Sequence, residues 1–122
     1  MPSCAVGTQQ RYLDRLIIRR DGRIVFLDTR EIEWIQADDK YVHFHTARGR
    51  CMVRKTLNAI QSELDPNRFV RIHRSAIINV DRIKELQPSF SGKHAVLMEN
   101  GARLILSRKY KDRLFDLLGK PL

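Results

Sequence analysis

The side chains best suited to chemistry stand next to one another at His73, Arg74 and Ser75. A histidine beside a serine is the pairing that activates a nucleophile in hydrolases, and the His-Arg-Ser order resembles the catalytic-loop tripeptide of protein kinases. The third position lacks the kinase carboxylate, and the sequence has neither a glycine-rich phosphate loop nor an Asp-Phe-Gly triplet. Side chains two residues apart on a strand stand about 6 to 7 Å apart, so His73 and Ser75 would need a kink to meet. We therefore do not expect an enzyme.

The same residues suit contacts with nucleic acid. In an alternating strand, Ile72 faces the core while Arg71 and His73 face outward. Arg74 and Ser75 then leave the strand into a turn. An arginine at a strand end matches the O6 and N7 acceptors of guanine with its planar fork, and a serine hydroxyl or a backbone N–H can hold a phosphate beside it. The alternative is an arginine that is simply solvated.

The charge of the chain indicates a polyanionic partner. Its 122 residues contain 23 Lys and Arg against 14 Asp and Glu, a formal net charge of +9. Residues 48–74 hold 7 basic and 2 acidic side chains, and residues 100–122 hold 6 and 2, so these segments carry +5 and +4 while the remainder is neutral. Separated basic segments are typical of nucleic-acid surfaces, although two solvated faces would have the same composition.

Four histidines and two cysteines raise the question of a metal site, and strand pairing argues against one. Arg48-Gly49 is predicted to form a two-residue hairpin loop, which pairs Thr46 with Cys51. The Cys51 side chain then lies on the face opposite to His43 and His45, whereas a three-residue loop would reverse this parity. No Cys-x-x-Cys or His-x-x-x-His spacing occurs elsewhere. We expect no metal and no cofactor, and we expect reduced thiols because two cysteines are too few for a disulfide framework.

Length and hydropathy predict one cytoplasmic domain. A chain of 122 residues with 43% hydrophobic residues and a mean hydropathy of −0.40 has room for one compact unit. No run approaches the roughly 20 apolar residues of a membrane span, and the first ten residues lack the features of a signal peptide. We divide the chain into a disordered or loosely ordered lead-in at residues 1–13 and one domain at residues 14–122.

Alternating hydrophobicity dominates the domain and predicts a mainly β fold. Asp21-Gly22 and Asn100-Gly101 are hairpin turn signals. A short internal helix is predicted after the N-cap residue Thr56 and ends before Asp65-Pro66. The expected strands cover residues 16–20, 23–27, 31–37, 41–46, 50–55, 69–73, 82–87, 95–99 and 103–106.

A second helix is predicted at the C-terminal end of the domain. Ser107 is its expected N-cap, which would bring Arg108, Lys109 and Lys111 into the first helical turn. Backbone N–H groups at a helix start already favour an anion. This segment therefore predicts a phosphate contact.

Four motifs follow one another along the chain. Residues 69–80 read Phe-Val-Arg-Ile-His-Arg-Ser-Ala-Ile-Ile-Asn-Val, and they are preceded by the segment 32–42 and by Lys55-Thr56-Leu57 and followed by Asn100-Gly101 with residues 106–110. In this order they resemble the LytTR family of bacterial DNA-binding domains. Residues 69–80 resemble the family signature, residues 32–42 its early strand, recognition loop and second strand, residues 55–57 the start of its helix, and the last motif its end. The resemblance covers residues from about 14 to 118.

The resemblance implies elongated antiparallel β-sheets with one short internal helix and a C-terminal helix, whose loops enter successive major grooves. The chain would be the sequence-specific, double-stranded DNA-binding output domain of a bacterial transcription regulator, of the LytR/AlgR response-regulator type found in two-component systems. Carried over position by position, the base contacts fall to Lys40, Arg74 and Arg108. The phosphate contacts fall to His73, Ser75, Asn79, Lys109 and Lys111.

Two features depart from the family pattern. Family members commonly carry Gly at the position of Asp39 and a neutral polar residue at that of Lys40, whereas here Asp38 and Asp39 bring two negative charges near the DNA. The family also usually follows a receiver domain or a membrane segment. The residues before about 14 are too few for either, so we expect a free-standing regulator or a C-terminal fragment.

The expected partner is duplex DNA with repeated half-sites. A receiver domain or sensor kinase would lie outside this chain. We expect a monomer in the free state and two copies on DNA, with half-sites about 10 bp apart. A non-enzymatic protein-interaction module, or a β module that binds anionic surfaces, is the alternative.

Overall fold

The computed structural model of the protein describes residues 15–119, so the predicted lead-in at residues 1–13 lies outside the described residues. The β-strands and α-helices in chain order are β1 (Arg15–Arg20), β2 (Arg23–Asp28), β3 (Ile32–Asp38), β4 (Tyr41–Thr46), β5 (Gly49–Val53), α1 (Leu57–Glu63), β6 (Phe69–His73), β7 (Ala76–Asn79), β8 (Ile83–Pro88), β9 (His94–Met98), β10 (Arg103–Leu106) and α2 (Lys111–Leu118). Short 3-10 turns connect several of them, among them Phe90–Gly92 and Arg108–Tyr110.

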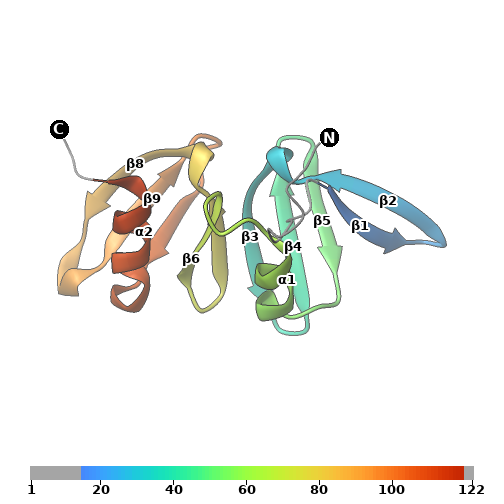
Figure 1. Cartoon of the computed structure of the whole chain (residues 1–122), viewed down its shortest axis with the longest axis horizontal. Coiled ribbons are helices and arrows are strands. Elements are labelled where there is room, and N and C mark those ends of the chain that lie inside the picture. Colours follow the sequence, from blue (N-terminus) through green and yellow to red (C-terminus); the bar gives the residue numbers. More distant parts are fainter. Residues whose placement is uncertain (1–14, 120–122) are drawn as a thin grey trace, which may run out of the picture.

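The strands form three antiparallel sheets that follow one another along the long axis of the molecule (Figure 1). The central sheet has the order β5-β4-β3-β7-β6, the hairpin β1-β2 projects from one end, and the sheet β10-β9-β8 lies at the other. Helices α1 and α2 pack on the same side, one over each half. This elongated, mainly β architecture with a short internal helix and a C-terminal helix confirms the predicted fold class.

Two hydrophobic cores meet at the strand pair β6-β7. Ile77 belongs to the core under α1, together with Ile35, Phe44 and Ile60. Ile78, its neighbour on β7, belongs to the core under α2. Successive strand residues point to opposite faces, so one strand contributes to both cores. The β6-β7 pair therefore joins the two halves of the molecule.

Strand β7 is absent from the sequence prediction. All four of its residues, Ala76–Asn79, are buried because β3 and β6 flank the strand and a core covers each face. A strand covered on both sides reads as a continuous apolar run and shows no alternation. The period-two pattern could not reveal it.

Helix α1 begins as its N-cap predicts. The Thr56 hydroxyl oxygen accepts a hydrogen bond from the Ala59 backbone N–H at 3.1 Å, which satisfies one of the unpaired donors of the first turn. Leu57, Ile60 and Leu64 are buried against the central sheet. The short helix thus seals the first core and leaves its polar residues, including Asn58, on the surface.

The β4-β5 hairpin corrects the predicted register and keeps the predicted face. Thr46 pairs with Gly49, so the loop consists of residues 47–48 and not of Arg48-Gly49. Cys51 consequently pairs with Phe44 instead of Thr46. The shift of the pairing moves each partner by two positions, which preserves the side of the sheet. Cys51 still packs against the first core, on the face opposite to His43.

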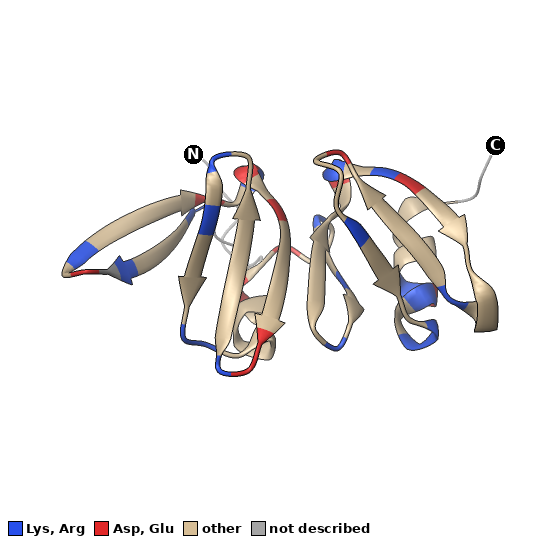
Figure 2. Cartoon of the chain, turned by 180° about the vertical axis from the view of Figure 1, so that it is seen from behind, with Lys and Arg blue, Asp and Glu red and all other residues tan. Residues whose placement is uncertain are grey.

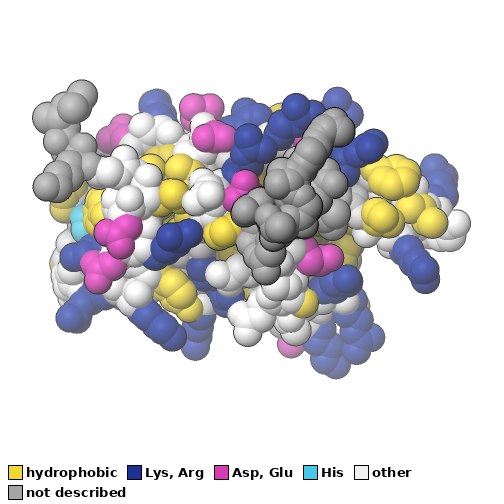
Figure 3. All heavy atoms as spheres, viewed as in Figure 1, with side chains coloured by type: hydrophobic (Ala, Val, Ile, Leu, Met, Phe, Trp, Pro, Cys, Tyr) yellow, Lys and Arg dark blue, Asp and Glu magenta, His cyan; other side chains and the backbone are white. Residues whose placement is uncertain are grey.

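The β1-β2 hairpin leaves part of its apolar surface uncovered. Leu16 and Ile18 are buried, whereas Ile17, Ile24 and Phe26 are exposed. Figure 3 shows this hydrophobic patch at the projecting end of the molecule, flanked by basic side chains.

Candidate nucleic-acid interface

The turn between β3 and β4 carries two acidic residues and one basic residue. Asp38 pairs with Tyr41, so Asp39 and Lys40 form a two-residue loop, and the side chains of all three turn residues are exposed. Asp39 has φ of 55°, a left-handed conformation that aspartate tolerates better than most residues. One Asp38 carboxylate oxygen lies 3.7 Å from Nε2 of His43, a largely buried residue on β4.

The turn between β6 and β7 brings the predicted His-Ser pair together. His73 pairs with Ala76, and Arg74 and Ser75 form the turn. Nδ1 of His73 lies 2.9 Å from the Ser75 hydroxyl and accepts the Ser75 backbone N–H at 3.2 Å. The kink that a strand would have needed is supplied by this turn. The Arg74 side chain is exposed at its tip.

The Arg71 side chain fixes the backbone of this turn. Its Nε donates to the His73 carbonyl oxygen at 3.0 Å, and its Nη2 donates to the carbonyl oxygen of Arg74. Nη1 donates to the side-chain oxygens of Asn58 at 2.7 Å and Gln61 at 2.9 Å, both on α1. One guanidinium therefore fixes both carbonyls of the turn and ties them to a helix. We call Arg71 with these four acceptors the Arg71 clamp.

The segment before α2 differs from its prediction. The Ser107 side chain makes no capping hydrogen bond, Arg108–Tyr110 form a 3-10 turn, and α2 begins only at Lys111. The Ser107 backbone N–H instead donates to the Ile72 carbonyl oxygen at 2.9 Å, which extends the β6 edge. Ser107 has the extended backbone of an N-cap residue, with φ of −78° and ψ of 157°, but its carbonyl oxygen accepts the Tyr110 backbone N–H at 3.1 Å and so starts the 3-10 turn. Helix α2 therefore begins after this turn and not directly after Ser107.

Arg108 and Lys109 are exposed on this 3-10 turn, and each rests on a neighbour. The Arg108 side chain lies so close to Gly92 that a Cβ at position 92 would stand 3.2 Å from its Cδ. Gly92 also has a left-handed φ of 75°, so glycine suits this position twice over. The Lys109 ammonium group lies 5.5 Å from the centre of the Tyr110 ring.

These three segments lie along one long edge of the molecule (Figure 2). The Ala37 backbone N–H at the end of β3 donates to the Ser75 carbonyl oxygen at 2.8 Å, which connects the β3-β4 turn to the β6-β7 turn. The bond from Ser107 to Ile72 connects the third segment in the same way. Lys and Arg are found in all three, and basic side chains line the same edge in Figure 3. We call this edge the basic edge.

Asn79 does not lie on the basic edge, and the predicted phosphate contact is wrong for this residue. Its side chain is 1% exposed. The amide nitrogen donates to the Ile32 carbonyl oxygen at 2.9 Å, and the amide oxygen accepts the Asp81 backbone N–H at 3.0 Å. The amide oxygen and one amide N–H thus cap the 3-10 turn that follows β7 and join β7 to β3, and burial keeps the remaining amide N–H out of reach of a phosphate.

Sequence reasoning missed the role of Arg71 and the position of Lys55. Arg71 was expected only to face outward from its strand, and its acceptors on α1 lie 10 and 13 residues away in the sequence. Lys55 and Arg74 line one small cavity of about 200 Å³ between the β3-β4 and β6-β7 turns. The basic excess of residues 48–74 was the available signal for Lys55, whereas no local pattern could reveal the Arg71 clamp.

Two further findings bear on other kinds of site. Among residues 15–119, no three His, Cys, Asp or Glu side chains gather in a way that could hold a metal ion. No helix in that range has both the length and the apolar character needed to cross a membrane.

Comparison with known proteins gives consistent matches. A family model described as the LytTr DNA-binding domain matches residues 22–119. The chain is 35% identical over 95 residues to the sensory transduction protein LytT of Bacillus subtilis, a match that covers 78% of this chain and 39% of that protein. It is 32% identical over 95 residues to the transcriptional regulatory protein LytR of Staphylococcus aureus, again 78% of this chain and 39% of that protein.

A solved LytTr DNA-binding domain from Bacillus cereus has the same fold. It superimposes with a TM-score of 0.78 at 23% sequence identity, over 88% of this chain and 99% of that domain. The chain thus spans about two fifths of the length of the curated relatives that it matches and nearly all of the solved domain.

Proposed function

The chain belongs to the LytTr DNA-binding domain family, whose function is DNA binding in transcription regulation, and we propose that it reads a specific duplex sequence through the basic edge. In this proposal the β3-β4 turn, the β6-β7 turn and the 107–110 segment enter successive major grooves. The observation that supports it is the alignment along one edge of these three segments from distant parts of the sequence. Each of them carries an exposed cation, which is Lys40, Arg74 or Arg108.

Each residue of the basic edge has a chemical role in the proposal. Arg74 and Arg108 present a planar fork of donors to guanine, and Lys40 offers a single ammonium group to a base acceptor. Ser75, Lys109 and Lys111 hold phosphates. His73 adds a phosphate contact through Nε2–H, because its Nδ1 already accepts the Ser75 backbone N–H.

Curvature of the duplex toward the protein follows from this arrangement. Three segments spread along an elongated edge reach bases in two grooves only if the DNA bends. Neutralising phosphates on one side lowers the cost of the bend, which is on the order of 1–6 kcal/mol. One domain of this size covers about one helical turn, so two copies on half-sites about 10 bp apart would bind tightly on the same side of the duplex.

In a regulator of the length of LytT or LytR, this domain would be the output unit of a bacterial two-component response regulator. A receiver domain or a sensor kinase would supply the signal. This extension is supported by the LytT and LytR relatives, each more than twice as long as the matched region.

Binding-site selection from random duplexes, followed by competition, tests the proposal. We expect one enriched sequence with two guanine-containing half-sites, and binding that survives an excess of unrelated duplex. Lys109→Ala should weaken the selected and unrelated duplexes alike, while Arg23→Ala, on the hairpin away from the basic edge, should change neither. If an excess of unrelated duplex displaces the chain completely from the selected duplex, the chain is only a polycation.

A further inference from the structure

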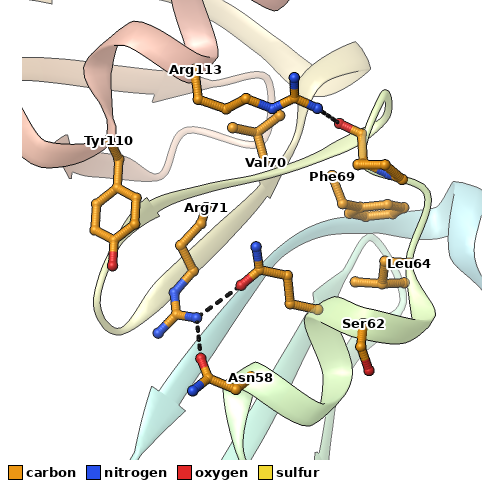
Figure 4. Close-up of a pocket in the computed structure, with 10 residues that line it drawn as sticks. Asn58, Ser62, Leu64, Phe69, Val70, Arg71, Tyr110 and Arg113 are labelled. Atoms are coloured by element: carbon orange, nitrogen blue, oxygen red, sulfur yellow. Dashed lines mark hydrogen bonds between the residues drawn. The ribbon is translucent and has the colours of Figure 1, made fainter.

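A groove between α1 and α2 lies on the face of the molecule that carries both helices (Figure 4). Its volume is about 460 Å³, within the range of roughly 300–1,000 Å³ that is typical of small-molecule sites. Leu64, Phe69 and Val70 form an apolar floor where the two halves of the molecule meet. Tyr110 and Arg113 border the groove on the α2 side.

Two guanidinium groups line this groove without a carboxylate beside them. Arg71 and Arg113 are lining residues, and no Asp or Glu is among the others. The acceptors of Arg71 are two side-chain amide oxygens and two backbone carbonyls, and Arg113 donates to the Pro66 carbonyl at 3.1 Å. Within the described chain neither arginine belongs to a salt bridge. The groove therefore combines an apolar floor with two positively charged side chains whose hydrogen-bond acceptors are all neutral.

We propose that this groove binds a small amphipathic anion whose flat apolar body lies on the Phe69 and Val70 floor. Its one carboxylate or phosphate draws in the guanidinium groups of Arg71 and Arg113, which in the free protein are turned toward opposite sides of the groove (Figure 4). Each guanidinium carries a full positive charge, which a carboxylate or phosphate attracts more strongly than the partial charge of an amide or carbonyl oxygen does. A carboxylate or phosphate can also accept two parallel N–H bonds from one guanidinium. An anion consequently competes well against the amide and carbonyl oxygens that the arginines now contact.

The groove is also connected to the basic edge, because Arg71 belongs to both. An anion that draws the Arg71 guanidinium toward the groove weakens its bonds to the carbonyls of His73 and Arg74. The β6-β7 turn then loses part of its support, and its backbone holds the Arg74 side chain in a less defined position. Ligand binding lowers affinity for cognate DNA by this route, a consequence that rests on the proposed function.

The binding step is tested without DNA, by NMR titration of the isotope-labelled chain with 2-naphthoate. We expect amide shifts at Phe69, Val70 and Arg113, and much weaker binding of the neutral 2-naphthamide. Arg113→Gln, an exposed helix position, should weaken 2-naphthoate by about tenfold, the value of one charge-assisted hydrogen bond. Arg23→Gln removes the same charge from the β1-β2 hairpin and should leave binding unchanged. Equal binding of the amide, or shifts confined to the apolar patch of that hairpin, would overturn the proposal.

A second titration tests the connection to DNA. We expect 2-naphthoate to raise the Kd for the selected duplex, and Arg113→Gln to require about tenfold more ligand for the same effect. Groove shifts with no change in DNA affinity would overturn the connection. If the duplex without 2-naphthoate shifts the amide signals of the groove residues, the groove belongs to the DNA-binding surface and the proposed small-molecule site is wrong. If no duplex is selected, the proposed function fails while the first titration still decides the groove.

Discussion

The β6-β7 and β3-β4 turns lie on the same edge of the molecule and are built in opposite ways. The β6-β7 turn is held by the Arg71 clamp and by the bond from Ala37 to Ser75, and its exposed tip is the cation Arg74. The β3-β4 turn has a left-handed Asp39 in its loop, and its one lysine follows two aspartates directly in the sequence.

This difference teaches which turn should carry specificity. A side chain on a fixed backbone loses less freedom on binding, so more of its contact energy appears as affinity. The positive charge of Lys40 is offset by the two neighbouring aspartates before any DNA arrives. We therefore expect the β6-β7 turn to read sequence and the β3-β4 turn to tune it.

The largest expected effect separates the two cations. Arg74→Ala should cost about 1–3 kcal/mol on the selected duplex and relax base preference at one position, because a bidentate guanine contact is lost. Lys40→Ala should cost about 0.5 kcal/mol, since its charge is offset by Asp38 and Asp39. Fluorescence anisotropy on the selected duplex and on single-base variants measures both. Equal losses for the two substitutions would contradict the comparison.

A smaller effect tests whether the Arg71 clamp is what distinguishes the β6-β7 turn. Asn58→Ala with Gln61→Ala removes the α1 end of the clamp and leaves Arg71 and Arg74 in place. We expect a loss of about 1 kcal/mol in affinity for the selected duplex, near the value of one net hydrogen bond, and little change for unrelated DNA.

Ser62→Ala is the matched control for the clamp. Ser62 lies on the same helix and donates only to the Ala59 carbonyl at 2.7 Å. An equal loss with this control would assign the effect to helix stability, and urea unfolding of the variants measures that stability directly.

Removing a negative charge from the β3-β4 turn should strengthen DNA binding. Asp39→Asn keeps a residue that tolerates the left-handed conformation while it deletes the carboxylate. A unit charge about 8 Å from a phosphate in water is worth ~0.5 kcal/mol, so affinity should rise about two- to threefold. Binding titrations at several salt concentrations test this expectation, since the gain should shrink as salt screens it. Unchanged affinity at low salt would remove the turn from the interface.

The smallest expected effect concerns pH and the sheet behind the β3-β4 turn. Burial lowers the pKa of His45 from 6.5, and the positive charge of Arg50 lowers it further. The folded state therefore favours the neutral ring, which stacks on Trp34 with 4.2 Å between ring centres. Stability from this group is fully present above the unfolded pKa and is lost as pH falls through about 6.5 toward the lower folded value.

Urea unfolding at about pH 7.5 and about pH 5.5 measures this contribution. His45→Phe retains an aromatic ring on Trp34 and cannot be protonated, so its loss of stability over this range should be smaller than that of the wild type. An unchanged pH dependence would assign the titration to another residue.

Local patterns in the sequence determined much of this protein. Alternation located nine of the ten described strands, the Thr56 cap located α1, and the Asp21-Gly22 signal located a tight turn with positive φ at both residues. These features depend on neighbours within a few residues, which the sequence contains directly. The basic segments and the family motifs likewise followed from residue order, and they predicted the exposed Arg74 and Arg108.

Only the tertiary structure decided the features that depend on distant partners. Strand β7 was invisible because its two flanking strands and two cores cover every residue. From the sequence, the Asn79 side chain could bind a phosphate or another part of the chain. In the structure it donates to the Ile32 carbonyl oxygen, 47 residues away in the sequence. The sequence shows Arg71 only as a basic residue on a strand, and its partners Asn58 and Gln61 on α1 lie 13 and 10 residues away. A buried polar group must find a partner, and which partner it finds depends on packing that no local pattern contains.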